Sequence, residues 1–428
     1  MKKSDFIHDL FYAARDKGVA LALARPVFED VRQRDIDLLI EHKNLPFLQD
    51  FLTQNKSLKR TCRVLRADGE TLHVYGIENE GSLALPIDAV TSLSFKGISY
   101  ADIRHVLQRA ETDENGVRTL DKVDQALILL ITHGVKHKGP LKQRYIDTVQ
   151  AAMKDSPVAF DEVVTTLFGD QAGLDLIDAI RANDLPPQLW KRLARRYVRH
   201  AWDRRGPLTV VDRISYYVTR VITAFVSPRY NVAVYGLDGS GKTTLIDNLQ
   251  KTLNLATTGI RCPHFLPSLP WRDEADSEVA LSTPHAKPKR GAFTSVVKLI
   301  YLLFRYWLAY LWPRQEAVLF LYDRSLPDIF ADPVRYRYGG PIEVLKWACR
   351  LAPPVTASIL VDVDAETAHS RKKEVSLAEA RRQSEAYRAL IGSLPNPIVL
   401  KGEMPADRLT AITTAHIVNA LTKRTEAK

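Results

Sequence analysis

One nine-residue segment limits what this chain can fold into more than any other part of its sequence. Residues 236–244 read Gly-Leu-Asp-Gly-Ser-Gly-Lys-Thr-Thr, directly after the apolar run Asn231–Tyr235 and before a stretch of helical character. A glycine, four further residues, a second glycine and a lysine followed by threonine make a phosphate-binding loop when a strand precedes them and a helix follows. The sequence therefore predicts a strand, a triphosphate-binding loop and a helix in immediate succession.

The residue types in this loop indicate how it binds phosphate. Its glycines let the backbone turn tightly with the N–H groups aimed inward, and the start of the following helix contributes its positive end. Lys242 is expected to reach the β- and γ-phosphates, and Thr243 to offer its hydroxyl to Mg²⁺. Thr244 either packs or contacts the α-phosphate. The loop residues predicted in this way to bind ATP are Gly236, Gly239, Ser240, Gly241, Lys242, Thr243 and Thr244.

A carboxylate and an arginine follow a second apolar strand. Residues Ala317–Tyr322 read as a buried strand, and Asp323 and Arg324 come directly after it. A phosphate-binding loop needs a carboxylate for the metal shell at the end of a neighbouring strand, and an arginine can bridge the oxygens of a phosphoryl group in transfer. Asp323 is therefore predicted to hold Mg²⁺ together with Thr243. Arg324 is predicted to be catalytic with Lys242, unless it forms only a surface ion pair with Asp323.

Basic residues follow a third apolar strand, Ser358–Val363. Arg371 and Lys372 come first, with further arginines downstream. Basic side chains on a segment that closes over ATP neutralise the charge of the γ-phosphate and exclude water. We therefore expect Arg371 to be catalytic and Lys372 to contact ATP, although a solvated helix face would carry the same residues.

The phosphate loop, the segment Asp323-Arg324-Ser325 and the later basic residues together resemble the thymidylate kinase family of P-loop nucleotide kinases, over about residues 230–428. The resemblance implies a five-stranded parallel sheet wrapped by helices, ATP with Mg²⁺, an arginine that spans donor and acceptor phosphates, and a basic lid. Asp238 matches the acidic loop position that faces the acceptor. Ser325 stands where an aromatic residue usually follows, and residues 263–298 have no counterpart in a compact nucleotide kinase, so thymidylate is not implied as the acceptor.

A narrower resemblance is carried by the run from Asp323 to Pro341, with Pro284-His285 upstream and residues 371–374 downstream. It is similar to uncharacterised thymidylate-kinase-like proteins that accompany bacterial surface-polysaccharide genes, and it implies no particular acceptor. A polar acceptor needs several fixed donors and acceptors at one end of the ATP site. The candidates for such a pocket, which ordinary loop ion pairing would also explain, are His285, Asp328, Asp332, Arg335 and Arg337.

The N-terminal part carries a second acidic motif. Asp35 and Asp37 fall on one face of an expected strand, which is how nucleotidyltransferases hold two Mg²⁺ ions on a triphosphate. This part resembles the polymerase-β-like nucleotidyltransferase fold. That fold also uses a third carboxylate, at the position where this sequence has Tyr75. Glu78 or Asp88 are possible substitutes. Both an active transferase and a degenerate binding domain remain open.

Composition places the chain among soluble globular proteins of the cytoplasm. Its 428 residues, 46% of them hydrophobic, are too many for one ordinary core. Its three cysteines lack metal-ligand spacing, which argues against disulfides and zinc and favours a reducing compartment. Periodicity divides the chain into a small nucleotidyltransferase-like α+β domain over 1–105, a helical bundle with a connecting helix over 106–228, and an α/β domain with the P-loop nucleotide-kinase fold and a parallel sheet over 229–428.

The net charge of +10 favours anionic partners. Nucleotide phosphates alone account for it, and nucleic acid is permitted but unsupported by a recognised module. Val296–Trp312 is the most apolar stretch, interrupted by Lys298 and Arg305, and we expect a buried or interfacial helix there rather than a membrane span. Peripheral membrane contact therefore stays open.

These features predict an enzyme, an ATP-dependent phosphotransferase that moves the γ-phosphate of ATP, with Mg²⁺, to a small nucleotide-like or glycan-linked acceptor. Two other classes remain open. One is a P-loop ATPase or switch whose nucleotide state regulates a partner. The other is a nucleic-acid end-processing kinase. The oligomeric state does not follow from the sequence.

Overall fold

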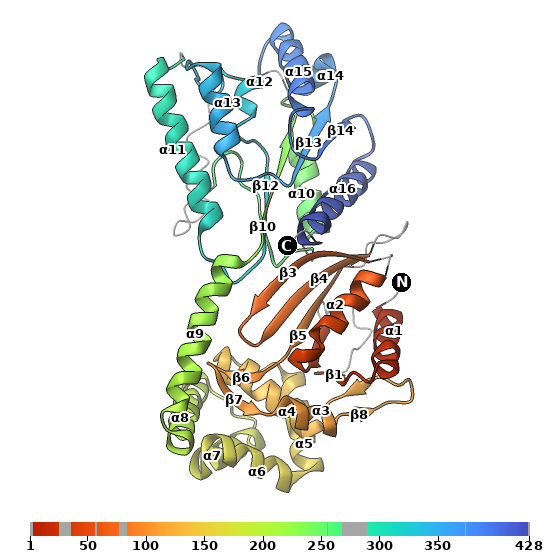
Figure 1. Cartoon of the computed structure of the whole chain (residues 1–428), viewed down its shortest axis with the longest axis vertical. Helices are drawn as coiled ribbons and strands as arrows, with labels where there is room; N and C mark the ends of the chain where they lie inside the picture. The colour runs from red at the N-terminus through yellow and green to blue at the C-terminus, as the bar shows by residue number, and fades with distance from the viewer. Residues whose placement is uncertain are drawn as a thin grey trace. The chain divides into compact units, whose positions relative to one another are not determined.

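The computed structural model describes residues 3–24, 36–55, 58–76, 84–254, 256–267, 289–372 and 374–426. The chain forms two compact units. Their helices and strands are labelled in Figure 1, which is coloured by residue number. The first unit consists of Met1–Leu58, Leu65–Leu72 and Glu78–Thr223, and the second of Lys59–Val64, His73–Ile77 and Ala224–Lys428. The three segments expected from periodicity remain a prediction about domain bounds.

The second unit is built on a five-stranded sheet whose neighbouring strands all pair in parallel. Its strand order is β11-β12-β10-β13-β14, so the first strand in sequence lies in the centre. This confirms the expected α/β fold class and the parallel sheet that the family resemblance implies. The strands are β10 (Arg229–Tyr235), β11 (Gly259–Arg261), β12 (Val318–Tyr322), β13 (Ala357–Asp362) and β14 (Pro397–Lys401).

Helices cover this sheet, which explains why its central strands read as unbroken apolar runs. Every residue of β10 and β12 is buried, as expected for parallel strands covered on both faces. In Figure 1, α11 lies beside α13 on one side of the sheet and α10 beside α16 on the other. The helices are α10 (Lys242–Thr252), α11 (Ala292–Leu311), α12 (Asp328–Ala331), α13 (Ile342–Leu351), α14 (Ala365–Arg371), α15 (Leu377–Ile391) and α16 (Ala406–Glu426).

The strand order places a binding crevice at a defined point. The chain passes from β10 outward to β11 and β12 on one side, and then to β13 and β14 on the other. In open α/β sheets of this kind, ligands bind at the carboxyl ends of the strands where the order reverses. That point is the carboxyl end of β10, and the segment that follows it is the phosphate-binding loop.

Helix α11 corresponds to the apolar stretch at 296–312. Within the described residues it is the one helix that is long and apolar enough to cross a membrane, and 28% of its most apolar window is buried. Leu299, Leu302 and Tyr306 face the protein, whereas Phe293 and Phe304 are exposed. It is therefore a helix with one buried apolar face and one exposed apolar face.

The first unit contains most of a seven-stranded mixed sheet of order β3-β4-β5-β2-β1-β9-β8. Two of its strands, β8 and β9, are only two residues long and lie where the periodicity predicted helices alone, because such short pairings leave no periodic signal. Strand β9 nevertheless pairs in parallel with β1. The strands are β1 (Leu21–Leu23), β2 (Ile36–Ile40), β3 (Leu58–Arg66), β4 (Gly69–Gly76), β5 (Ala84–Val90), β8 (Glu111–Thr112) and β9 (Arg118–Thr119), with a separate hairpin of β6 (Leu93–Phe95) and β7 (Ile98–Ala101).

The helical part of this unit packs around large aromatic side chains. Trp190, Phe160 and Phe168 are fully buried in one apolar cluster. A Cβ atom on Gly134 would lie 2.4 Å from the Trp190 ring, so only glycine lets the two helices approach this closely. The helices of the unit are α1 (Lys3–Asp16), η1 (His42–Asn44), α2 (Leu45–Gln54), α3 (Ile103–Arg109), α4 (Lys122–Leu129), η2 (Leu130–Lys136), α5 (Gln143–Asp155), α6 (Pro157–Phe168), α7 (Asp170–Arg181), α8 (Pro187–Arg205) and most of α9 (Leu208–Val226).

Candidate active site

The phosphate loop has the backbone conformation that its glycines permit. Gly236, Gly239 and Gly241 have φ angles of 143°, 85° and 94°, which other residues rarely adopt. A Cβ atom on Gly236 would lie 2.5 Å from the carbonyl oxygen of Val361, and one on Gly239 would lie 2.7 Å from that of Ala368. The loop is therefore seated between the end of β10 and the segment around β13 and α14, with no room for a side chain at Gly236 or Gly239.

Lys242 is the first residue of α10, and its side chain folds back over the loop. Its Nζ donates hydrogen bonds to the carbonyl oxygens of Gly236 at 2.9 Å and Leu237 at 2.7 Å. Burial, and then the charge of Arg324, lower the pKa of Lys242 to about 8. A phosphate in the loop would give this ammonium group an anionic partner and raise its pKa again.

Two unpartnered polar atoms in this region indicate that the residues fit a nucleotide and its metal. The hydroxyl of Ser240 is buried in the loop, and Oδ1 of Asp323 is buried at the end of β12; neither has a hydrogen-bond partner among the described residues. Buried polar atoms normally have partners. A phosphate oxygen at Ser240 and Mg²⁺ at Asp323 would supply them. Thr243 and Thr244 are exposed on the first turn of α10.

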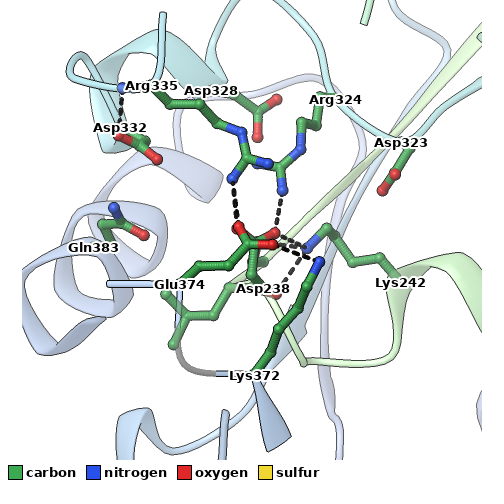
Figure 2. Close-up of polar contacts among 12 residues, drawn as sticks. Asp238, Lys242, Asp323, Arg324, Asp328, Asp332, Arg335, Lys372, Glu374 and Gln383 are labelled. Carbon is green, nitrogen blue, oxygen red and sulfur yellow. Dashed lines mark hydrogen bonds and ion pairs between the residues drawn. The ribbon is translucent and has the colours of Figure 1, made fainter. Parts of the chain in front are cut away.

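Asp238 is the centre of a dense charge cluster (Figure 2). Its carboxylate accepts hydrogen bonds from Arg324 and from Arg335, and Nζ of Lys242 lies 4.0 Å away. Burial by itself would raise the pKa of Asp238, but the charges of Arg324, Lys242 and Arg335 outweigh it and hold the pKa well below the ordinary range. Two guanidinium groups therefore converge on one anion of the phosphate loop.

Asp323 and Arg324 are adjacent in sequence but turn to different partners. Arg324 is 5% exposed and binds Asp238, whereas Oδ2 of Asp323 lies 2.8 Å from Nδ1 of His264. The alternative of a surface ion pair between Asp323 and Arg324 is therefore wrong. Burial tends to raise the pKa of Asp323, but the hydrogen bond from His264 and the charge of Lys242 hold it below its usual value. The carboxylate is thus charged, as a metal ligand must be.

His264 is a site residue that sequence reasoning missed. It follows β11 at the edge of the sheet, and the amide N–H of Asp323 donates to the carbonyl oxygen of Pro263 at 3.3 Å. The carboxyl ends of parallel neighbours meet at one edge. The sequence signal for His264 was its position just beyond a strand. That strand, β11, has only three residues and is hard to recognise from its pattern.

Asp328 lies inside the protein rather than in an acceptor pocket. It is 0% exposed, accepts a hydrogen bond from the Ser325 amide at 2.6 Å, and accepts another from the Tyr387 hydroxyl at 3.0 Å. The Ser325 hydroxyl in turn donates to the Tyr235 oxygen at 2.9 Å. Burial raises the pKa of Asp328 to about 6, although the charge of Arg324 opposes this. This network fixes the segment that carries Arg324.

Of the other residues predicted for an acceptor pocket, Arg335 joins the charge cluster at Asp238 directly. It also lies 3.4 Å from Glu374. The carboxylate of Asp332 accepts from the backbone N–H of Arg335 at 3.0 Å and so positions it. Arg337 bends the chain with a φ of 53°. His285 lies outside the described residues.

The basic segment after β13 reaches the phosphate loop at one point. The Arg371 guanidinium donates to the Gly239 carbonyl oxygen at 3.4 Å. Lys372 pairs with Glu374 at 2.7 Å. Arg371 and Lys372 thus stand where a basic segment over ATP would stand, and their predicted roles remain predictions.

The acidic motif of the first unit has a cation among its carboxylates. Asp37 on β2 and Asp88 on β5 are register partners on neighbouring parallel strands. Arg66 lies 2.9 Å from Asp68 and 3.4 Å from Asp88. Burial would lower the pKa of Arg66, but the negative charges of Asp68, Asp88 and Asp37 raise it above its usual value.

Two candidate metal ligands of this motif, Asp35 and Glu78, lie outside the described residues. Among the residues that are described, no group of three His, Cys, Asp or Glu side chains is placed to hold a metal ion. Asp88, one of the two substitutes for the third carboxylate, lies beside Asp37 and is already paired with a cation.

Comparison with known proteins finds similarity to solved structures only, at low identity and low TM-score. No family model matches the chain, and no curated protein matches it. Similar solved structures include the deoxyadenosine kinase of M. mycoides with the products dCMP and a flexible dCDP bound (13% identity, TM-score 0.31, covering 44% of this chain and 98% of that one). The same kinase with dCTP bound matches at 14% identity with a TM-score of 0.29, and with dATP bound at 15% with a TM-score of 0.28. These values bear on neither substrate nor activity.

Proposed function

We propose that the second unit is an ATP-dependent phosphotransferase that moves the γ-phosphate of ATP to a small nucleotide-like or glycan-linked acceptor. The observation that carries the proposal is the convergence of Arg324 and Arg335 on Asp238 of the phosphate loop, next to Lys242. A loop for triphosphate, a second set of cations beside it and a carboxylate at the neighbouring strand end are the parts that phosphoryl transfer requires.

In this proposal the loop holds ATP through its backbone. The N–H groups of residues 236–241 and the start of α10 receive the phosphates, and Lys242 exchanges its carbonyl partners for phosphate oxygens. Thr243 and Asp323 would hold Mg²⁺, which neutralises charge on the phosphates when bound. Arg371, from the end of α14, would add a positive charge over the loop.

Arg324 and Arg335 would hold the acceptor, and Arg324 would also bridge the oxygens of the phosphoryl group in transfer. In the transfer, an acceptor oxygen bonds to the γ-phosphorus, the bond between that phosphorus and the β-bridging oxygen breaks, and ADP leaves. Asp238 has a lowered pKa and is a weak base, so it orients Arg324 and Arg335 rather than abstracting a proton. An acceptor that brings a phosphate of its own needs no base and pairs well with two guanidinium groups. Such an acceptor is the form that this site favours.

One experiment separates this proposal from an ATPase or switch. Purified full-length protein is incubated with ATP and Mg²⁺ and a panel of nucleoside monophosphates, sugars, sugar phosphates and sugar nucleotides, with ADP and phosphorylated product measured separately. We expect ADP formation to depend on an acceptor. ADP formed together with free phosphate, at a rate that no acceptor changes, would instead indicate an ATPase. Phosphorylation of DNA or RNA ends would indicate the nucleic-acid kinase.

For the first unit we propose a degenerate nucleotidyltransferase-like domain rather than an active transferase. What supports this is Arg66, whose guanidinium already neutralises the carboxylates of Asp68 and Asp88 beside Asp37. A measurement of pyrophosphate release with each of the four nucleoside triphosphates and Mg²⁺ or Mn²⁺ tests it, and sustained release would contradict it. We further propose that the protein works in the cytoplasm.

A further inference from the structure

Helix α9 presents its apolar side to solvent. Six large apolar side chains are between 51% and 60% exposed in the part of α9 that belongs to the first unit. They are Leu208, Val211, Ile214, Val218, Val221 and Ile222. Their spacing of three or four residues places them on one face of the helix. A contiguous apolar face of this kind on a folded protein marks a surface that contacts something else.

The polar side of the same helix is the packed side. Thr209 is buried and its hydroxyl donates to the Ala201 carbonyl oxygen at 3.1 Å, and Asp212 pairs with Arg205 at 2.9 Å. The turn between β6 and β7 also closes on this side, because a Cβ atom on Gly97 would lie 2.4 Å from the Asp212 carbonyl oxygen. These contacts fix which face of α9 is outward, and that face is the apolar one.

The preceding helix, α8, adds a strongly basic surface. Five exposed basic residues line a shallow depression along one face of α8: Lys191, Arg192, Arg195, Arg196 and Arg199. Only two residues, Gly206 and Pro207, separate α8 from α9. Over residues 187–226 the sequence has nine arginine or lysine residues and two aspartates, and it has no acidic residue before Asp203. The outward apolar face is thus linked to a surface that favours negative charge.

We propose that α8 and α9 form a docking surface for an anionic lipid bilayer. An apolar helix face enters the boundary between headgroups and acyl chains, and neighbouring arginines and lysines bind anionic headgroups. A bilayer satisfies both features at once. A second copy of the chain, docked through the same two helices, would bring one basic surface against another, which is unfavourable. This inference does not depend on the proposed phosphotransferase activity.

The test uses full-length protein and sedimentation with two kinds of vesicle. One is phosphatidylcholine alone, and the other is phosphatidylcholine with about 30% phosphatidylglycerol, which gives the vesicle a negative surface potential. We expect binding to the anionic vesicles that is at least about tenfold tighter than to the neutral ones and that weakens as salt is raised. Equal affinity for both vesicles, or no binding to the anionic ones at low salt, would overturn the proposal.

Variants separate the two features of the surface. Val211→Glu with Val218→Glu should reduce vesicle binding by at least about tenfold, and so should Arg195→Glu with Arg196→Glu. The matched control is Val158→Glu, because Val158 is 79% exposed on α6, outside the proposed surface, and its substitution should leave binding unchanged.

Further measurements check that the variants are folded and test whether the surface binds a second copy of the chain instead of a bilayer. Circular dichroism and thermal melting show that each variant is folded, and the wild-type comparison of the two vesicle types stands even if one variant is not. Sedimentation velocity shows whether the wild type self-associates without lipid. If Val211→Glu with Val218→Glu dissociates a dimer and leaves vesicle binding intact, the face is an interface between copies and the proposal is wrong.

Discussion

Arg324 donates a hydrogen bond to the carboxylate of Asp238, and so joins the segment after β12 to the phosphate loop after β10. Both residues follow parallel strands that are neighbours in the sheet. The chain next to Arg324 is fixed by Asp328, whose carboxylate accepts hydrogen bonds from the Ser325 amide and the Tyr387 hydroxyl. An arginine fixed in this way is preorganised, so it binds an incoming phosphate without first losing the entropy of a mobile side chain.

Lys242→Ala should abolish most ATP-dependent turnover, by roughly 10²–10³-fold, because the ammonium group serves phosphate charge. The fold should survive, because the loop conformation depends on its glycines. The measurement is ADP formation with saturating ATP, beside a thermal melt. Lys251→Ala, at the exposed last turn of the same helix, is the control and should behave as wild type. Full turnover in Lys242→Ala would contradict the assignment of the site.

Asp323→Asn and Arg324→Ala should fail in different ways. Loss of the Asp323 charge should raise the Mg²⁺ concentration needed for half-maximal rate, because the neutral amide is a weaker metal ligand. Loss of Arg324 should lower kcat on the order of 10³-fold while ATP affinity changes little, as for a group that acts mainly in the transition state. Steady-state kinetics across a Mg²⁺ titration measure both. Arg350→Ala, an exposed arginine on α13, serves as control. Equal small effects from both substitutions would argue against the assigned roles.

Asp328→Asn should change how stability depends on pH. Burial raises the pKa of Asp328 to about 6 from 3.8, so the folded state binds a proton more tightly than the unfolded state does. The cost of the buried charge is absent below about pH 4, grows between about pH 4 and 6, and is complete above about pH 6. At about 1.4 kcal/mol per pKa unit, the wild type should lose about 3 kcal/mol relative to Asp328→Asn over that window.

Urea unfolding of both proteins at about pH 4, 5, 6 and 7 measures this difference across the titration. Asparagine can keep the bonds to the Ser325 amide and the Tyr387 hydroxyl, so the variant should fold. Asp407→Asn, at an exposed position at the start of α16, should run parallel to the wild type. A difference between Asp328→Asn and wild type that is constant with pH would show that Asp328 does not titrate in this range.

Asp35→Ala combined with Asp37→Ala should leave ATP-dependent phosphoryl transfer within about tenfold of wild type, a change worth roughly 1.4 kcal/mol. The reason is that the proposed reaction uses residues of the second unit alone. Full-length protein is required, because residues 59–64 and 73–77 belong to the second unit although they lie early in the chain. A loss of a hundredfold or more in phosphoryl transfer, with an unchanged thermal melt, would mean that the two ends of the chain share one chemistry.

The sequence by itself determined the phosphate loop and the fold class around it. The loop binds through backbone groups of residues that are adjacent in the chain, so the spacing of Gly236, Gly241 and Lys242 is sufficient to predict it. The buried strands β10, β12 and β13 were also predictable, because strands covered on both faces are continuous apolar runs. Asp323 and Arg324 followed from their position directly after such a strand.

Only the tertiary structure decided which side chains meet. His264 lies 59 positions before Asp323, and Arg335 lies 97 positions after Asp238, yet parallel pairing brings these residues to one edge of the sheet. Asp328 has the sequence context of an acceptor residue, but packing buries it. The same is true of α9, because periodicity shows that a helix has an apolar face but not whether that face is turned inward. Its direction is set by contacts such as that of Gly97 with Asp212, which connect residues far apart in the chain.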